Sequence, residues 1–421
     1  MRPPRPHIAI VIANLPAERD RRVIRECLTL EEEGYEVTVI APRGRKGLRT
    51  LPGSRGTRLR PYPVWVYGSG LLSFALEFVS SFLFVAARLT VEVLRGRAHA
   101  VQVCNPPDVY WPLAMVYRFL LRRPWVFDHH DLCPEIYATR SGGSPNRSAY
   151  RMLVAMERLT LRHSSAVFAT NRSFVENATA RGVPADKVTV VRNGPKRDEI
   201  AAAGPDAPGG DGVQRLVYVG VIGPQDSVDV AVLAAEELTR LRGRTGWKLV
   251  IAGDGEMLPA LKKMVCEKSL GDVVEFPGWL DGPGVDALLR SGTIAIQPDQ
   301  PSAMNDRSTM AKTVEYVARG LPVVAADLTE TRRTAEDAAV YVPTGAPSEF
   351  AKAIDALLDD PERRGQMRAT GLARFTELLS WEHQAQAYTS VWNRLLSHRR
   401  PPVVPRPRVE GAPSTSQPVT R

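Results

Sequence analysis

The sequence is poor in cysteine and has no recognisable metal-binding pattern. Its 421 residues include four cysteines, which lie far apart at positions 27, 104, 133 and 266. None of them forms a C-x-x-C pair and no matching histidine spacing accompanies them, so neither a disulfide framework nor a zinc site is indicated. Four unpaired thiols fit a reducing compartment such as the cytoplasm best.

Long apolar runs and targeting signals are also missing. The N-terminus passes from a basic stub into a short apolar run without a small-residue cleavage site, which argues against a secretory signal. The most apolar stretch, Leu71 to Val93, is interrupted by Glu77, Arg88 and Glu92, so we do not expect it to cross a bilayer. The chain is therefore expected to act in the cytoplasm.

Phenylalanines recur within this apolar stretch, at positions 74, 78 and 82. A spacing of four residues places them on one face of a helix. That face could belong to a core helix, or to a helix that lies at a membrane interface beside the neighbouring basic segment. The sequence leaves both interpretations open.

Acidic residues are absent from one strongly basic segment. The formal net charge is +9, and the stretch from Arg43 to Arg60 contains seven Lys and Arg residues without any Asp or Glu. No aromatic residues are interleaved with these cations as a base-stacking surface would require, so nucleic acid is not an expected partner. The segment either contacts anionic lipid headgroups or is a solvated loop. In the first case the protein would lie at the inner face of the plasma membrane.

Short apolar runs alternate with helical patterns along almost the whole chain, which is typical of parallel sheets covered by helices. The expected strands of the first half are His7–Ala13, Glu36–Ala41, Val64–Tyr67, Ala100–Cys104, Trp125–Asp128, Ser165–Ala169 and Val188–Val191. Those of the second half are Arg215–Val219, Lys248–Ala252, Val273–Phe276, Thr293–Gln297, Leu321–Ala325 and Ala339–Val342. The pattern predicts an α/β fold with two Rossmann-like, doubly wound parallel-sheet domains.

Composition divides these elements into segments. We expect a first domain over 1–194, a Gly- and Pro-rich linker over 195–213, a second domain over 214–380, a helix over 381–398 that returns toward the first domain, and a disordered tail over 399–421. Ligands of doubly wound sheets bind beyond the carboxyl ends of the strands, so the active site is expected in a cleft between the two domains.

The segment 298–327 predicts a phosphate-binding helix start. Good N-cap residues precede a helix-compatible run from Ala311 to Arg319. On a helical wheel Ser308, Lys312 and Glu315 share one face. Free amides and a lysine suit a diphosphate, and a carboxylate one turn deeper suits ribose hydroxyls, as in a nucleotide-sugar donor site. The alternative is an ordinary surface helix with a Lys312–Glu315 ion pair.

Several motifs resemble one enzyme family. In chain order they are DRRVIRECLTLEEEGYEVTVIAPRG from position 20, NPPD at 105–108, VFDHHDLCPEIY at 126–137, VVRNGP at 190–195, YVGVIGPQDSVD at 218–229, VIAGDGEMLPALK at 250–262, VEFPGWL at 274–280, KTVEYVARGLPVVAAD at 312–327 and the helix at Trp381–Glu382. Their order and spacing resemble the retaining glycosyltransferases of family 4, which have the GT-B fold, and especially bacterial members that build exopolysaccharide, O-antigen and capsule.

The resemblance assigns donor-binding roles in the second half. Glu315 matches the second glutamate of the family's E-x7-E motif, which holds the donor ribose, whereas Arg307 stands where the first glutamate would be. The family's usual basic pair is replaced by Val221 and Asp226.

Other groups are expected to compensate for that missing pair. A leaving diphosphate needs preorganised positive groups. We expect these to be Arg307, Lys312 and the amides around Gly223 and from Ser308 through Thr309 to Met310. Gly220 and Gly223 form the donor loop, or are tight-turn glycines only.

In the first half the resemblance points to the loop after the strand at 125–128. His130 matches the family's active-site histidine, and with Lys312 and Glu315 it completes the expected catalytic set. Asp131 and Glu135 would orient His130 or contact the acceptor. His129 is expected to have no catalytic role and to be either surface-exposed or structural. Asp20, Arg21 and Arg22 could face the cleft, where Asp20 and Arg21 would contact the acceptor, or they could cap a helix.

Neither a metal ion nor a cofactor is expected. The sequence has no D-x-D pair of the kind that bridges a divalent ion to a diphosphate. The glycine-rich turn AGDG at 252–255 is weak evidence for a ligand, and packing at a strand end explains it better.

The preferred interpretation is a retaining glycosyltransferase that moves a sugar from a nucleotide-diphosphate donor to a glycan or polyprenyl-linked acceptor. A nucleotide-sugar 2-epimerase of the same fold and a non-catalytic sugar-nucleotide-binding homologue remain as alternatives.

Overall fold

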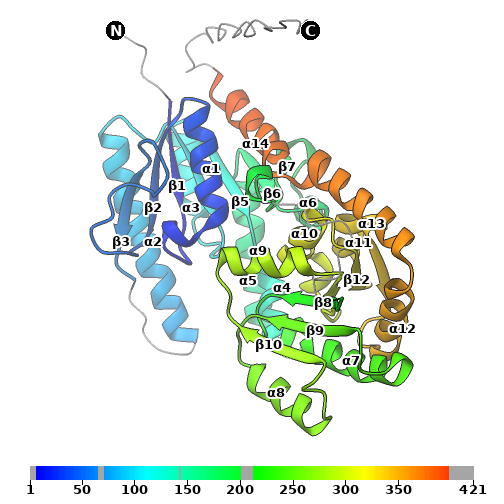
Figure 1. The fold of residues 1–421 in the computed structure, drawn as a ribbon. Coiled ribbons are helices and arrows are strands. Elements are labelled where there is room, and N and C mark those ends of the chain that lie inside the picture. The colour runs from blue at the N-terminus through cyan, green and yellow to red at the C-terminus, as the bar shows by residue number, and fades with distance from the viewer. Residues whose placement is uncertain (1–5, 65–70, 142–143, 201–211, 398–421) are drawn as a thin grey trace, which may run out of the picture.

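The computed structural model describes residues 6–64, 71–141, 144–200 and 212–397, and it contains two parallel sheets in two lobes (Figure 1). The seven-stranded sheet has the order β3-β2-β1-β4-β5-β6-β7 and the six-stranded sheet β10-β9-β8-β11-β12-β13. Every strand pairing in both sheets is parallel. The predicted fold class of two doubly wound domains is therefore confirmed.

The strands of the first lobe are β1 (His7–Val11), β2 (Glu36–Pro42), β3 (Arg58–Tyr62), β4 (Ala100–Cys104), β5 (Trp125–His129), β6 (Ala166–Ala169) and β7 (Val188–Val190). Those of the second lobe are β8 (Gln214–Val219), β9 (Trp247–Ala252), β10 (Val274–Gly278), β11 (Ile294–Gln297), β12 (Val323–Ala326) and β13 (Ala339–Val342). The inner strands are mostly buried and rich in apolar residues, because helices cover both faces of each sheet.

The helices follow the strands as crossover connections. They are α1 (Arg21–Glu32), α2 (Leu71–Leu94), α3 (Trp111–Met115), α4 (Cys133–Arg140), α5 (Arg147–Arg162), α6 (Arg172–Ala180), α7 (Val228–Arg242), α8 (Leu258–Glu267), α9 (Gly282–Ser291), α10 (Ala311–Ala318), α11 (Thr329–Ala335), α12 (Pro347–Leu358), α13 (Pro361–Arg374) and α14 (Trp381–Leu395). Short 3₁₀ turns η5 (Pro224–Asp226) and η6 (Asn305–Arg307) lie in loops of the second lobe.

The third strand lies earlier than the sequence predicted. We expected it over 64–67, but β3 spans Arg58–Tyr62, Val64 lies outside it, and 65–67 fall outside the described residues. Two arginines make this strand look polar in the sequence. Arg58 pairs with Glu36 at 3.0 Å and Arg60 with Glu92 at 2.9 Å, while Leu59 and Tyr62 are buried. Part of the expected basic loop is thus an edge strand.

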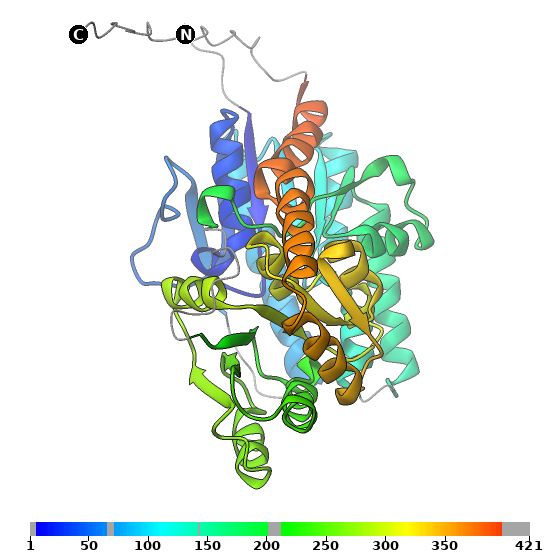
Figure 2. The same ribbon diagram turned by 45° about the vertical axis from the view of Figure 1, so that its right-hand side comes forward.

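The C-terminal helix α14 packs against the first lobe, to which it leads from α13 in the second (Figure 2). Trp381, Tyr388 and Trp392 are buried in the same cluster as the core residues of β1 and β2. The Trp381 indole donates a hydrogen bond to Thr29 Oγ1 at 2.9 Å, and the Tyr388 hydroxyl donates one to Gln102 Oε1 at 2.8 Å. The linker residues 201–211 and the tail 398–421 lie outside the described residues.

Helix α2 buries one apolar face and exposes another. Phe82 packs against the core and stacks on Tyr110 at 6.1 Å between ring centroids. The side chain at 74 lies outside the described residues, and the exposed apolar face is formed by Leu76, Val79 and Leu83, the last 62% exposed. Within the described ranges, no helix is long and apolar enough to cross a membrane.

Candidate functional site

The carboxyl ends of the two sheets face each other, and the loops that follow them touch. The Asn171 side chain, after β6, donates hydrogen bonds to the Arg307 carbonyl oxygen at 2.8 Å and to Thr309 Oγ1 at 3.1 Å. Arg307 Nη1 also lies 3.3 Å from Glu135 Oε1 across the same gap. The two residues expected to bind donor and acceptor therefore pair with each other here.

A second contact between the lobes lies at the start of α11. The buried Glu330 carboxylate accepts hydrogen bonds from the Ser173 amide at 2.9 Å and hydroxyl at 2.8 Å. Arg333 of the same helix pairs with Glu330 and with Glu176 of α6 at 2.9 Å each. These contacts hold the lobes together on the side of β6 and β7.

Lys312, the second residue of α10, is the centre of a buried ionic cluster. Its ammonium donates hydrogen bonds to Asp299 Oδ1 at 2.8 Å, Asp226 Oδ1 at 2.9 Å and the Tyr218 hydroxyl at 3.2 Å. Its side chain is 9% exposed. Burial opposes its charge, but Asp299 and Asp226 outweigh burial and raise the pKa of Lys312. All three ammonium hydrogens are therefore engaged, so a contact with phosphate requires one of them to change partner.

The helical wheel for this segment was wrong at its first residue. Ser308 has extended backbone angles and α10 begins at Ala311, so Ser308 does not share a helical face with Lys312. Glu315 is partly exposed and pairs with Arg319, which excludes the alternative Lys312–Glu315 ion pair in this structure. Whether Glu315 binds ribose stays a prediction.

The residues before α10 form an amide-rich turn. The amides of Thr309, Met310, Ala311 and Lys312 have no hydrogen-bond acceptor among the residues that the structure describes. Such free amides at a helix N-terminus favour an anion. The turn lies at the carboxyl end of β11 and touches the opposite lobe through Asn171.

The loop after β8 lies against this cluster. Val221 is 61% exposed, whereas Asp226 is buried and accepts hydrogen bonds from the Gly223 amide and from Lys312. The acid at the position of an expected basic residue is therefore a ligand of the Lys312 ammonium. A Cβ on Gly220 would lie 3.2 Å from the Tyr218 hydroxyl and 3.6 Å from Lys312 Cε, so this glycine lies directly at the cluster.

The AGDG turn supports that loop by close packing. Gly253 has φ of +143°, and a Cβ there would lie 1.8 Å from the Gly220 carbonyl oxygen. Its amide donates to the Gly278 carbonyl at 2.9 Å. Backbone packing thus requires this glycine, as the sequence interpretation expected. Trp279, next to Gly278, is 73% exposed and offers an aromatic face at the same edge.

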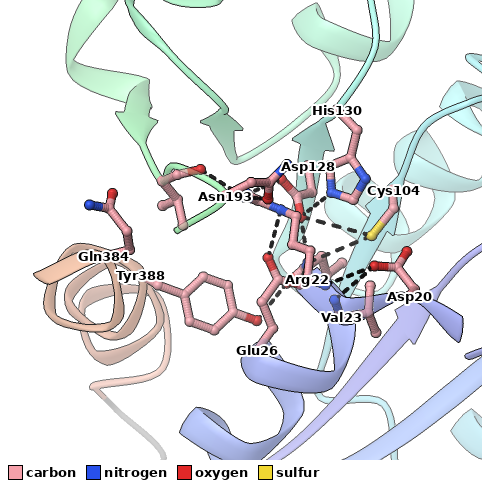
Figure 3. Close-up of polar contacts among 12 residues, drawn as sticks. Asp20, Arg22, Val23, Glu26, Cys104, Asp128, His130, Asn193, Gln384 and Tyr388 are labelled. Carbon is pink, nitrogen blue, oxygen red and sulfur yellow. Dashed lines mark hydrogen bonds and ion pairs between the residues drawn. The ribbon is translucent and has the colours of Figure 1, made fainter. Parts of the chain in front are cut away.

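In the first lobe, His130 is held by a buried carboxylate (Figure 3). His130 Nε2 lies 2.7 Å from Asp128 Oδ2, and the His130 amide donates to Asn105 Oδ1 at 2.6 Å. Burial alone would raise the pKa of Asp128, but Arg22 and His130 outweigh it and hold that pKa far below its usual range. An ionised carboxylate only accepts, so Nε2 carries the hydrogen and Nδ1 remains for another partner.

Asp128 also anchors a wider buried network around Arg22 (Figure 3). Arg22 donates to both Asp128 oxygens, at 2.7 and 3.1 Å, and to the Val191 carbonyl at 2.7 Å. Gln102 links Asp128 to Glu26 and accepts from Tyr388 of α14. Burial and Asp128 raise the pKa of Glu26 well above its usual value, so Asp128 is the anion that balances Arg22.

Among the other predicted residues of this lobe, some lie at the gap between the lobes and others cap a helix. Asp20 caps α1 by accepting from the amides of Arg22 and Val23, and Arg21 is exposed beside it. Asp131 is half-buried and its backbone is held by Asn105. The buried Glu135 faces Arg307 and Arg181, at 3.3 and 3.7 Å, and burial raises its pKa. Asp20 is thus a helix cap, whereas Glu135 faces the gap.

His129 is fully buried, 3.4 Å from Glu157, as expected for a structural residue.

Asp108, the last residue of the NPPD motif, is a buried carboxyl group without a hydrogen-bond partner for its side-chain oxygens in the described chain. Burial raises the pKa of Asp108 to about 7. His129 lowers this pKa and Glu157 raises it. Because the folded state holds this proton between about pH 4 and pH 7, the unfolding free energy should fall by up to about 4 kcal/mol as pH rises through that range. Urea unfolding from pH 4 to pH 8 should show a flatter profile for Asp108→Asn than for the wild type.

Asp186→Asn, at an exposed position, is the control for the Asp108 prediction and should keep the wild-type slope. An unchanged slope in Asp108→Asn would show that Asp108 does not titrate in this range.

One group of side chains could be considered for a metal ion. Donor atoms of Cys104, Asp128 and His130 lie within 4.8 Å of one another. Asp128 is already bound to the Arg22 guanidinium, and burial raises the pKa of the Cys104 thiol well above its usual value. A neutral thiol and an adjacent fixed cation make this a poor cation site.

The sequence interpretation missed several residues that position the site. They are Asn105, Asp128, Asn171 and Asp299. The available signal was their location: each lies at the carboxyl end of a predicted strand or within the two residues after it, where buried polar groups are costly without a partner.

Known proteins share this arrangement. Residues 21–194 match the family described as Glycosyl transferase 4-like domain, and residues 213–360 match Glycosyl transferases group 1. Alpha-D-kanosaminyltransferase from Streptomyces kanamyceticus is 32% identical over 154 residues, 36% of this chain and 38% of that protein. D-inositol 3-phosphate glycosyltransferase from Kineococcus radiotolerans is 28% identical over 196 residues, 44% of this chain and 45% of that protein. The chain thus spans less than half the length of these curated relatives.

Solved structures share the whole fold. Sucrose-phosphate synthase from Thermosynechococcus elongatus has a TM-score of 0.72 at 17% identity, with 94% of this chain and 100% of that chain covered. HepE from Anabaena, in complex with UDP-glucose, has a TM-score of 0.65 at 15% identity, with 92% and 99% covered. The two matched families in chain order, together with the facing parallel sheets, show that this chain belongs to the glycosyltransferases of GT-B fold that combine a 4-like domain with a group 1 domain.

Proposed function

We propose that the protein is a retaining glycosyltransferase that moves a sugar from a nucleotide-diphosphate donor to a hydroxyl of a glycan or lipid-linked glycan, in the synthesis of cell-surface polysaccharide or glycoconjugate. The observation that carries the proposal is the turn before α10. Its free amides and the Lys312 cluster lie at the carboxyl edge of one sheet and touch the loops of the other. HepE in complex with UDP-glucose supports a nucleotide-sugar donor.

The donor diphosphate would lie against the amides from Thr309 to Lys312. The Lys312 cluster contains one cation and two carboxylates, so a diphosphate beside it is repelled unless the ammonium moves from one aspartate to a phosphate oxygen. Arg307, whose side chain is nearly half exposed, can add charge by leaving Glu135. These groups would stabilise the charge of the leaving diphosphate without a metal ion or cofactor.

His130 would position the transferred sugar or the acceptor through Nδ1, because Asp128 holds Nε2. In the proposed step the bond from the anomeric carbon to the diphosphate oxygen breaks. The acceptor oxygen bonds to that carbon on the same face, and its proton passes to the departing diphosphate oxygen. No protein nucleophile takes part.

A panel of UDP-, GDP- and dTDP-sugars tests the proposal. A donor at 100 times its dissociation constant should stabilise the protein by about 2.7 kcal/mol, seen as a raised thermal midpoint. Stabilisation by no member of the panel would contradict donor binding. A donor converted to its 2-epimer without acceptor would indicate the epimerase, and a donor bound but never consumed with any acceptor would indicate a non-catalytic homologue.

Association with an anionic membrane is a separate part of the proposal. Leu76, Val79 and Leu83 expose an apolar face on α2, which belongs to the same lobe as the basic segment 43–60. The wild type should co-sediment with phosphatidylglycerol vesicles at low salt, and Leu76→Ser/Val79→Ser/Leu83→Ser should not. Leu241→Ser, at an exposed position of α7, should bind as the wild type does. No co-sedimentation of the wild type would contradict membrane binding.

A further inference from the structure

A basic cavity lies beside β2 and β3 in the first lobe, away from the amide-rich turn before α10. Its volume is about 270 Å³, and its lining comes from the carboxyl ends of β2 and β3, from Ala17 and Glu18 after β1, and from residues 43–48. Its floor is apolar and buried, with Val39, Ala41 and Leu59. The cavity and His130 both lie at the carboxyl ends of their strands. These ends are on the same side of the sheet, because β2, β1, β4 and β5 are parallel neighbours.

The lining of this cavity is strongly positive. It includes Arg43, Arg45, Lys46 and Arg60 but only one acid, Glu18. Arg60 is paired with Glu92, and Glu18 accepts from the Arg45 amide at 2.7 Å. The side chains of Arg43, Arg45 and Lys46 are exposed and have no ion-pair or hydrogen-bond partner in the ranges that the structure covers. Three unneutralised cations around a cavity favour a multiply charged anion such as a phosphate or diphosphate.

The distance from the cavity to the reacting centre suits an acceptor that reaches both. Neighbouring strands lie about 4.8 Å apart, so the carboxyl end of β2 is roughly 14 Å from that of β5, which carries His130. A free anion this far from His130 could not receive a sugar there. An extended acceptor could place an anionic group in the cavity and a hydroxyl beside His130.

Helix α2 gives the cavity an apolar neighbour. Tyr62 stacks on Phe84 and Pro61 accepts from Arg88, so the second half of α2 packs antiparallel to β3. Its first half therefore extends beyond the carboxyl end of β3 (Figure 1), and the exposed Leu76 and Val79 lie on that part. A phosphate in the cavity could thus belong to an isoprenoid carrier as well as to a water-soluble glycan phosphate.

We propose that the cavity formed by residues 43–48 and the ends of β2 and β3 binds the phosphate or diphosphate group of the acceptor. The proposal rests on the proposed glycosyltransferase function. It specifies an acceptor whose anionic group lies roughly 14 Å from the hydroxyl that receives the sugar. The cations hold the phosphate and the apolar floor excludes water beneath it.

The test compares two double variants that each remove two charges from the same basic segment. Arg45→Gln/Lys46→Gln removes cavity cations, whereas Arg49→Gln/Arg55→Gln removes exposed cations that do not line it. Calorimetry with farnesyl phosphate, farnesol and glucose 1-phosphate should show binding of a phosphate probe to the wild type. The cavity variant should weaken that binding on the order of 10- to 100-fold, and the control variant less than about threefold.

The arms of this test separate the sources of the phosphate. Tighter binding of farnesyl phosphate than of glucose 1-phosphate supports an isoprenoid carrier, and equal binding supports a soluble glycan phosphate. Binding of neither phosphate probe, or equal loss in both double variants, overturns the proposal. Nucleotide-sugar stabilisation, measured in parallel, should be the same in the cavity variant and the wild type. If nucleotide-sugars stabilise neither the wild type nor the variants, this result would contradict the proposed function instead.

Discussion

Replacing Lys312 with alanine should abolish most turnover and also destabilise the second lobe. Lys312 is the cation between the two buried carboxylates Asp226 and Asp299. Breaking a buried ion pair by removing one partner typically costs about 3 to 5 kcal/mol, because uncompensated charge remains. Loss of the group that stabilises the leaving diphosphate should lower kcat by about 10²- to 10³-fold. Urea unfolding and initial rates with the identified donor measure the two effects.

A variant in which the whole cluster is uncharged separates the effect on turnover from the effect on stability. In Lys312→Met/Asp226→Asn/Asp299→Asn no charge is left unpaired, so the unfolding free energy should recover most of its loss. The rate should stay low, since the cation is still missing. Recovery of both properties together would show that Lys312 acts on stability alone, and near-normal turnover in Lys312→Ala would remove Lys312 from the catalytic set.

Replacing His130 with alanine should lower kcat by about 10²- to 10³-fold, because its ring is proposed to position the transferred sugar or the acceptor. Stability should change little, because the ring is partly exposed. Asp128→Asn should impair turnover less, since the ring remains but its tautomer is no longer fixed. It should also lower the unfolding free energy, because the buried Arg22 loses the anion that balances it. Nitrogen chemical shifts of the His130 ring should show the hydrogen on Nε2 in the wild type and a mixture in Asp128→Asn.

His383→Ala, at an exposed position on α14, is the matched control for the histidine prediction and should leave kcat unchanged. Wild-type turnover in His130→Ala would contradict a role for the histidine. An unchanged tautomer in Asp128→Asn would show that Asp128 does not position it.

Most of the fold could be predicted because the inner strands are short runs rich in apolar residues that alternate with helical patterns. The strands His7–Val11 and Ile294–Gln297 are fully buried, and apolar runs of this length between helical patterns are typical of strands in a parallel sheet. The edge strand β3 could not be placed, because Arg58 and Arg60 supply the polar half of its pattern and their partners Glu36 and Glu92 lie far away in sequence.

The candidate site was predicted only in its main side chains. Lys312 and His130 stand in motifs that resemble a family, and both lie at the facing sheet edges in the structure. Their partners Asp299 and Asp128 gave no periodic signal. Such pairings depend on which strand ends are neighbours, and strand order follows from packing rather than from local sequence.

Hydrogen exchange with and without a nucleotide-sugar donor tests the central claim most directly, because it locates the bound diphosphate on the chain. The donor should slow exchange of the free amides from Thr309 to Lys312 and of the loop from Gly220 to Asp226, and leave α12 unchanged. A donor that stabilises the protein without slowing exchange in these two segments would contradict the claim that the turn before α10 holds the diphosphate.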